Sequence, residues 1–249
     1  MTPRGRMIVA IDGPAESGKS STARWVAEKL GYRHVDSGAL YRAVTWLALR
    51  DGGDAAEWTE HALCALAERV SLAPSPGGFE PMVDGTRVGD AVRGPDVTRH
   101  VSRVAQLAAV RRWVNERVRA TSAEHDVVVD GRDIGTVVFP EAPVKVFLVA
   151  DPWERARRRL IQRLGRHPQE DEIAEETELL VLRDSRDATQ TVQARDAVLI
   201  DTTYLTQTEQ VDRIVALARA RERALATAEG EPAAEGAPGA GEASRRTEA

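Results

Sequence analysis

The fold of this chain is decided by residues 8–21, IVAIDGPAESGKSS. An apolar run of strand length enters a Gly-x-x-x-x-Gly-Lys-Ser loop, and residues 22–30 continue with helical spacing of apolar side chains. In this arrangement backbone N–H groups line the loop, and the N-terminal end of the helix favours an anion. The stretch therefore predicts a phosphate-binding loop between a buried strand and a helix.

The loop residues have distinct expected roles. Lys19 is expected to reach the β and γ phosphates of a nucleotide, and the Ser20 hydroxyl is placed to hold Mg²⁺. Glu16 is unusual, because a carboxylate beside a triphosphate is repelled unless it points to solvent, so we expect Glu16 to be exposed. The alternative is a plain Gly/Ser turn, although chance matches usually lack the flanking strand and helix. The expected nucleotide-binding residues are Gly13, Pro14, Ala15, Glu16, Ser17, Gly18, Lys19, Ser20 and Ser21.

Length and composition limit the classes of protein. A chain of 249 residues is long enough for one large α/β domain, and 34 basic against 39 acidic residues give a net charge of −5. This balance argues against a nucleic acid polymer as a partner. The longest apolar stretches have strand length, the N-terminus lacks a signal-peptide core, and Cys64 is the single cysteine. We therefore expect a cytoplasmic protein with no membrane partner. A monomer is expected as well, although these features do not bear on it.

Strand and helix patterns alternate along the chain. Helical spacing between residues 96 and 120 is broken near Ala108, and a hairpin with its turn at Asp84-Gly85 is expected to lie as an insertion over the main sheet. The pattern predicts an α/β fold, a doubly wound parallel sheet with helices on both faces. The expected strands are 8–11, 32–35, 127–129, 144–149 and 198–201, and the further helices are 41–50, 60–70, 151–164, 173–185 and 209–226.

Charged residues follow two of the expected strands. The segment 36–42, DSGALYR, follows the second strand, and 130–133, DGRD, follows the third. In a doubly wound sheet these ends face the same crevice as Lys19. Arg42, Arg132 and Asp133 could then bind a second anion that carries hydrogen-bonding groups, because guanidinium groups pair with phosphate and a carboxylate accepts from amino or hydroxyl groups. The alternative is that they pair only with one another at the surface.

Two later helices carry polar residues at helical spacing. Arg183, Asp187 and Gln190 share one helix face and could clasp a ribose or a phosphate, although such a pair is also common on exposed helices. A second set precedes the loop at residues 165–168 and could form a closing lid; the alternative is a solvated arginine face. That set is Arg155, Arg158, Arg159 and Gln162.

Over approximately residues 7–226 the chain resembles the bacterial cytidylate kinases, a branch of the nucleoside monophosphate kinases. The most specific marks are DSGALYR at 36–42, DGRDIGTVVFP at 130–140 and RDSRD at 183–187. The resemblance implies transfer of the γ-phosphoryl group of ATP to CMP or dCMP, with Mg²⁺ bridging the β and γ phosphates. The catalytic residues it implies are the loop lysine Lys19 and three arginines, Arg132, Arg158 and Arg159.

The resemblance also implies the acceptor site. The cytosine would be lined by Ser37, Ser102, Arg111 and Asp133. The monophosphate would be gripped by Arg42 and Arg132, the nucleotide would pack against Tyr41, and the sugar would contact Arg183 and Asp187. A carboxylate suits cytosine because this base presents an N4 amino donor, where uracil has a carbonyl.

The domain organisation follows from the same resemblance. Residues 1–228 would form a single kinase unit with its core at 7–36, 96–150 and 190–226, a monophosphate-binding region with the β insertion at 37–95, and a helical lid at 155–189. Residues 229–249 are rich in Ala, Glu, Gly and Pro and are expected to be disordered.

Two residues depart from the family pattern. Glu16 occupies a loop position that is usually Gly, and Gln190 stands where the family can place a further phosphate-binding Arg. The neutral amide removes one charge-assisted contact, so monophosphate affinity or lid closure would be weaker unless Arg186 compensates. Two alternatives remain open at this point: a catalytically impaired nucleotide-binding regulatory protein, and a kinase of another small acceptor such as UMP.

Overall fold

The computed structural model describes residues 6–230, and the predicted alternation of strands and helices is confirmed in them. The strands are β1 (Ile8–Asp12), β2 (Arg33–Asp36), β3 (Val70–Ser75), β4 (Gly78–Val83), β5 (Thr86–Arg87), β6 (Val127–Asp130), β7 (Val144–Val149) and β8 (Val198–Asp201). The helices are α1 (Lys19–Leu30), α2 (Ser37–Asp51), α3 (Glu60–Ala67), α4 (Pro95–Gln106), α5 (Ala108–Thr121), α6 (Pro152–Leu164), α7 (Glu170–Asp187) and α8 (Gln207–Gly230). Three short helical turns are η1 (Ala55–Glu57), η2 (Gly89–Arg93) and η3 (Ile134–Val138).

The sheet has the order β3-β4-β2-β6-β1-β7-β8, with β5 paired to β4. The neighbouring strands β2, β6, β1, β7 and β8 are parallel, so their carboxyl ends meet at one edge. The chain leaves β1 toward β2 on one side and returns to β6 and β7, which flank β1. This reversal of strand order beside β1 is where doubly wound sheets bind ligands.

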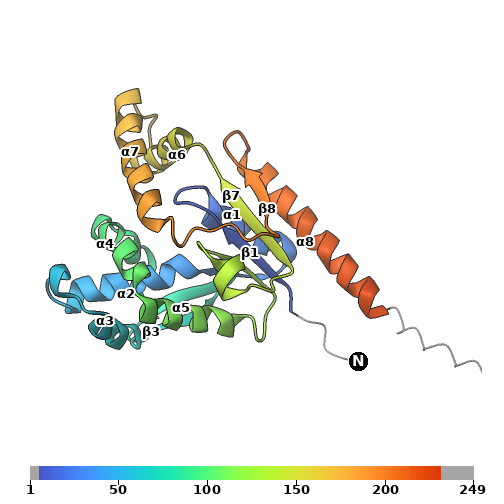
Figure 1. The fold of residues 1–249 in the computed structure, drawn as a ribbon, viewed down its shortest axis with the longest axis horizontal. Coiled ribbons are helices and arrows are strands. Elements are labelled where there is room, and N and C mark those ends of the chain that lie inside the picture. Colours follow the sequence, from blue (N-terminus) through green and yellow to red (C-terminus); the bar gives the residue numbers. More distant parts are fainter. Residues whose placement is uncertain (1–5, 231–249) are drawn as a thin grey trace, which may run out of the picture.

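Two apolar cores cover the two faces of the sheet. One core joins Ala10, Val35 and Val129 to helices α2, α3 and α5, and the other joins Val9 and Ile11 to α1 and α8. Figure 1 shows α8 along one side of the sheet, α2 to α5 on the other, and α6 with α7 beyond the end of β7. The buried β-branched run of β6 explains the two-sided packing, because both faces of a central parallel strand are covered.

The predicted position of the β insertion is wrong. Strands β3, β4 and β5 form two antiparallel hairpins, and β4 also pairs in parallel with β2 through His34 and Gly78. The insertion therefore extends the edge of the main sheet instead of lying over it. The predicted turn at Asp84-Gly85 is confirmed, and it joins β4 to β5.

Several helix boundaries differ from the predictions. Helix α2 begins at Ser37 rather than at residue 41, because the Asp36 side chain accepts a hydrogen bond of 3.0 Å from the backbone N–H of Ala39 and so caps the helix. The break near Ala108 is confirmed, since Leu107 takes an extended conformation between α4 and α5. Helix α8 continues through residues 229–230, and the remainder of the predicted tail lies outside the described residues. Within residues 6–230, none of the helices combines the length and apolar character needed to cross a bilayer.

Candidate active site

A cavity of about 680 Å³ opens beyond the carboxyl ends of β1, β2 and β6. Its walls come from the phosphate loop, α2, α4, α5, α6 and α7, and cationic side chains outnumber acidic ones on them. All of the predicted acceptor residues line it: Ser37, Tyr41, Arg42, Ser102, Arg111, Arg132, Asp133, Arg183 and Asp187. The predicted catalytic residues Lys19, Arg132, Arg158 and Arg159 line it as well.

The phosphate loop connects β1 to α1 with little room for side chains. Gly13 has a φ of 147°, and a Cβ atom there would lie 2.1 Å from the carbonyl oxygen of Leu148, so only glycine fits. Gly18 has a φ of 88° and directly precedes α1. The backbone thus presents the N-terminal end of α1 to the cavity, where an anion is favoured.

Lys19 is the buried cation of the loop. Its side chain is only 6% exposed, and Nζ donates to the carbonyl oxygen of Pro14 and, at 3.4 Å, to Oγ of Ser17. Burial, and then the charge of Arg132, lowers the pKa of Lys19 to about 7. An arriving phosphate would favour the charged ammonium, so the loop is set up to respond to an anion.

Ser20 opens onto the cavity beside a buried carboxylate. Its Oγ donates to Oδ2 of Asp130 at 2.5 Å, and Nε2 of His34 lies 2.7 Å from Oδ1 of the same carboxylate. Burial alone would raise the pKa of Asp130, but the hydrogen bonds from His34 and Ser20 hold it below its ordinary value. A hydroxyl and a persistent carboxylate are oxygen ligands suited to the shell of a hard divalent cation.

Asp12 is a site-organising residue that sequence reasoning missed. Its two carboxylate oxygens accept hydrogen bonds from the backbone N–H groups of Ile134 and Gly135, at 2.8 and 2.7 Å. These bonds fix the single turn η3, which directly follows Asp133. Burial raises the pKa of Asp12 to about 6. The available signal was an ionisable residue at the end of an otherwise apolar strand.

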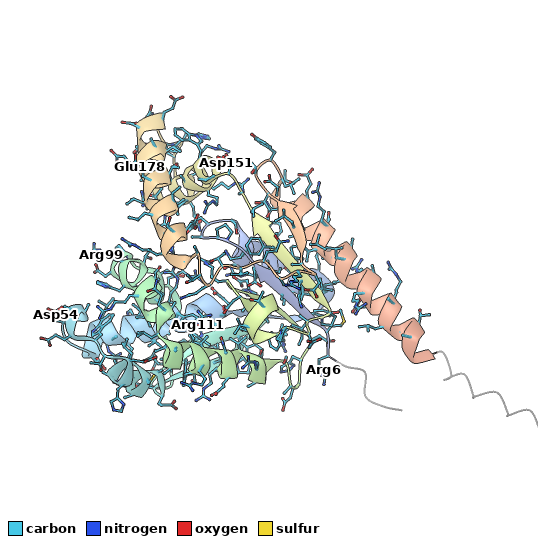
Figure 2. The ribbon with its side chains drawn as sticks, in the orientation of Figure 1. Arg6, Asp54, Arg99, Arg111, Asp151 and Glu178 are labelled. Atoms are coloured by element: carbon cyan, nitrogen blue, oxygen red, sulfur yellow. The ribbon has the colours of Figure 1, made fainter. Side chains whose placement is uncertain are left out.

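Arg111 and Asp133 form a partly buried ion pair on the acceptor side of the cavity. Arg111, labelled in Figure 2, lies in the first turn of α5 and contacts Oδ2 of Asp133 through Nη2. Its Nη1 donates to Oε1 of Gln190 at 3.0 Å and to the carbonyl oxygen of Ala105 at 3.1 Å. Burial raises the pKa of Asp133. A fixed carboxylate beside a fixed guanidinium can recognise a planar group that both donates and accepts hydrogen bonds.

Three further arginines, Arg42, Arg132 and Arg183, surround the same cavity. Burial, and then the charge of Arg183, lowers the pKa of Arg42 to about 10. Asp187 lies 3.5 Å from Nη2 of Arg132 and 3.8 Å from Nε of Arg183, so one carboxylate serves both. Among the described residues, the buried Nε atoms of Arg132 and Arg183 have no hydrogen-bond partner. Three arginines that line one cavity, two of them with an unsatisfied buried donor, are suited to an anionic ligand.

The α6–α7 pair provides the remaining wall. Arg155 is buried, donates to the carbonyl oxygen of Ala15 at 2.8 Å and pairs with Asp184 at 2.7 Å. Arg158 donates to Glu154 and to the carbonyl oxygens of Thr202 and Thr203. Asp151 at the start of α6 and Glu178 on α7, both labelled in Figure 2, mark this pair of helices. These contacts join the predicted lid to the phosphate loop and to the loop after β8.

The expectation of an exposed Glu16 is wrong. Its side chain is 31% exposed, and Oε1 lies 2.6 Å from Nη1 of Arg159. Glu16 also has a φ of 58°, in the left-handed region that favours glycine. The other departure, Gln190, contacts Arg111. Arg186, which could have compensated for it, is exposed and does not line the cavity.

A phosphate loop and a second charged site that open onto one cavity at the carboxyl edge of a parallel sheet are the arrangement of a P-loop phosphotransferase acting on a small molecule. The family profile described as Cytidylate kinase matches residues 9–220. The chain belongs to the cytidylate kinase family.

Curated relatives agree with this assignment. The chain is 43% identical to a cytidylate kinase of Limosilactobacillus fermentum over 211 residues, which cover 83% of this chain and 92% of the relative. It is 44% identical to a cytidylate kinase of Geobacillus kaustophilus over 222 residues, covering 87% and 98%. Among solved structures it is similar to a shikimate kinase from Bacteroides thetaiotaomicron, with a TM-score of 0.43, 15% identity, and coverage of 88% and 98%. The activity of the family is that of a phosphotransferase that uses ATP.

Proposed function

We propose that this protein transfers the γ-phosphoryl group of ATP to CMP or dCMP, giving ADP and CDP or dCDP. The observation that carries the proposal is that the phosphate loop with Lys19 and the Arg111–Asp133 pair open onto one cavity. Two nucleotides that face each other across such a cavity would bring donor and acceptor phosphates together. Residues 1–228 then act as one kinase unit, with residues 37–95 on the acceptor side and 155–189 as the lid.

ATP is assigned to the loop, with its phosphates along residues 13–21. Of these residues Ala15, Glu16, Gly18, Lys19, Ser20 and Ser21 line the cavity, whereas Gly13, Pro14 and Ser17 shape the loop behind it. Ser20, supported by Asp130, is assigned to the shell of Mg²⁺, because a hydroxyl next to a buried ionised carboxylate fits a hard cation. When bound, this ion would neutralise charge on the β and γ phosphates.

The acceptor is assigned to the opposite wall. Asp133, held by Arg111, would accept the N4 amino group of cytosine, with Ser37 and Ser102 lining the base. Arg42 and Arg132 would bind the monophosphate, and the position of both arginines on the cavity wall supports this role. The sugar is assigned to Arg183 and Asp187, and the packing surface to Tyr41.

In the transfer step an oxygen of the acceptor phosphate forms a bond to the γ-phosphorus of ATP. The bond between that phosphorus and the β–γ bridging oxygen breaks, and ADP leaves with the bridging oxygen. No covalent enzyme intermediate is needed. Lys19, Arg132, Arg158 and Arg159 are assigned to the charge that develops on the transferring group. A cytoplasmic location is part of the proposal, because a single cysteine cannot form a disulfide within the chain. A monomeric state is proposed as well.

The proposal is tested by incubating the protein overnight with ATP, Mg²⁺ and CMP and separating the nucleotides by ion-exchange chromatography. We expect CDP and ADP in equal amounts. Tight ATP binding with no CDP would instead support a regulatory protein that has lost catalysis.

ATP binding is expected to take up a proton above neutral pH. The free protein holds Lys19 with a pKa of about 7 because of burial, and bound phosphates would raise that value. At pH 8 Lys19 is therefore mostly neutral before binding and charged afterwards, with an uptake approaching about one proton and an affinity that falls as the pH rises. Calorimetric titration in two buffers of different ionisation enthalpy measures this uptake. Its persistence in Lys19→Met would contradict the assignment.

Replacing Gln190 by Arg is expected to raise the KM for CMP by about three- to tenfold. The amide oxygen of Gln190 accepts a hydrogen bond from Arg111, so a guanidinium there would repel Arg111 and disturb its pair with Asp133. Steady-state kinetics with CMP measures the change. Gln193→Arg, at an exposed position, is the matched control. A lower KM for CMP in Gln190→Arg would contradict this expectation, because it would mean that an added guanidinium at position 190 binds the phosphate of CMP.

A further inference from the structure

Glu16 and Arg159 join the phosphate loop to the lid before any nucleotide is bound. Their side chains meet at 2.6 Å, and Glu16 also contributes negative charge next to Lys19, Arg42 and Arg183. A carboxylate therefore sits among the cations that are assigned to the phosphates. Its charge resembles that of the ligand, and the two would compete for the same partners.

The backbone holds Glu16 in this place. Its φ of 58° is costly for a residue with a side chain, whereas its neighbour Ala15 is buried in an apolar cluster with Ala156, Leu160 and Leu180 of the lid. Arg155 further fixes the loop by donating to the carbonyl oxygen of Ala15. The carboxylate is thus presented to α6 by a loop that cannot easily move away.

Arg159 can leave Glu16 without creating an unpaired buried charge. Its Nε pairs with Glu176 at 2.9 Å, and Glu176, which is almost fully buried, also pairs with Arg163 at 3.0 Å. If Arg159 turned toward a phosphate, Glu176 would keep Arg163 as its partner. Glu16 is 31% exposed and could then be solvated by water. By contrast, the contacts of Arg155 go to a backbone carbonyl and to Asp184, which suits a permanent anchor.

We propose that Glu16 is a positioning residue that holds Arg159 over the phosphate loop, and that Arg159 leaves Glu16 to contact the phosphates when ATP binds. The inference rests on the proposed function, and it adds an internal competitor to the donor site. The ion pair keeps Arg159 close to the site of the ATP phosphates. It also lowers the affinity for ATP, because ATP binding must break the contact. Glu16 thereby weakens the binding of phosphorylated nucleotides and leaves the binding of an uncharged nucleoside unaffected.

The test measures the dissociation constants of the β,γ-imido analogue of ATP and of adenosine for Glu16→Gln by calorimetry, with Mg²⁺ and without CMP. We expect the analogue to bind to Glu16→Gln about tenfold more tightly than to the wild type, and the dissociation constant of adenosine to be the same for both proteins. Glu16→Gly should bind at least as tightly, because glycine suits the positive φ, and it serves if the Gln variant folds poorly. Glu172→Gln, which removes the partner of Arg166 at 2.6 Å on the lid, is the matched control and should change neither constant.

A second experiment separates the effect of the Glu16–Arg159 contact from direct repulsion between the Glu16 carboxylate and the phosphates. In an Arg159→Gln background, the Glu16→Gln substitution should tighten binding by less than about threefold. A full gain in that background would overturn the positioning role, as would equal affinities of wild type and Glu16→Gln or an equal gain for adenosine. If the wild type turned over CMP normally in those cases, the proposed function would stand without this inference. If the wild type bound neither ATP nor CMP, both would fail.

Discussion

Replacing Lys19 by Met is expected to lower the turnover number for phosphoryl transfer by about a thousandfold or more. Lys19 is the cation that the phosphate loop itself supplies, and its ammonium is held at the loop by Pro14 and Ser17. A Met side chain has a similar length but no charge, so the geometry of the loop is kept while the stabilisation of the transferring phosphate is lost.

The fold should tolerate this change. Burial disfavours the charged form of Lys19, as its lowered pKa shows, so the buried ammonium destabilises the folded protein. An apolar side chain of similar length removes this destabilisation. Thermal unfolding should occur at or above the temperature of the wild type. The matched control is Lys29→Met in the same helix, where an exposed ammonium pairs with Asp212 at 2.6 Å, and it should keep full activity. Turnover of Lys19→Met within tenfold of the wild type would contradict the role of Lys19.

Replacing Asp133 by Asn is expected to reduce the preference for CMP over UMP by about a hundredfold in kcat/KM. The carboxylate can only accept hydrogen bonds, which matches the amino group of cytosine and opposes the carbonyl of uracil. An amide can both donate and accept, so it can serve either base. Asp133 is 7% exposed, and an unmatched polar group there would stay unsatisfied.

Competition between CMP and UMP, followed by separation of CDP from UDP, measures this preference directly. Arg111 keeps its hydrogen bonds to Gln190 and Ala105 in the variant, so the fold of the site should persist. Asp84→Asn is the matched control, because Asp84 forms an exposed ion pair with Arg69 and Asn tolerates its positive φ. An unchanged preference in Asp133→Asn would refute base recognition by this carboxylate.

Local sequence signals predicted most of the fold because each of them acts within a few residues. The glycine spacing of the phosphate loop, the β-branched run of β6 and the helical spacing of apolar residues depend only on neighbours in the chain. The position of the hairpins depends instead on the pairing of His34 with Gly78 across 44 residues. A Cβ atom on Gly78 would lie 2.3 Å from the carbonyl oxygen of His34, but in the sequence this glycine resembles any other turn glycine.

The candidate site was predictable where residues follow strands, since parallel strands bring their carboxyl ends together. That rule placed Arg42, Arg132 and Asp133 on one cavity. It could not identify the partners of Glu16 and Gln190, because Arg159 is 143 positions from Glu16 and Arg111 is 79 positions from Gln190. Both departures from the family pattern therefore acquired a physical meaning only through tertiary contacts.

The central claim is that one cavity joins an ATP site to a cytosine-reading acceptor site. Its most direct test is the initial rate of ADP release at saturating ATP and Mg²⁺ with CMP, dCMP, UMP and AMP as separate acceptors. We expect CMP and dCMP to be used with kcat/KM values at least about a hundredfold above those of UMP and AMP. Equal turnover of UMP and CMP, or no ADP release with CMP, would contradict this account.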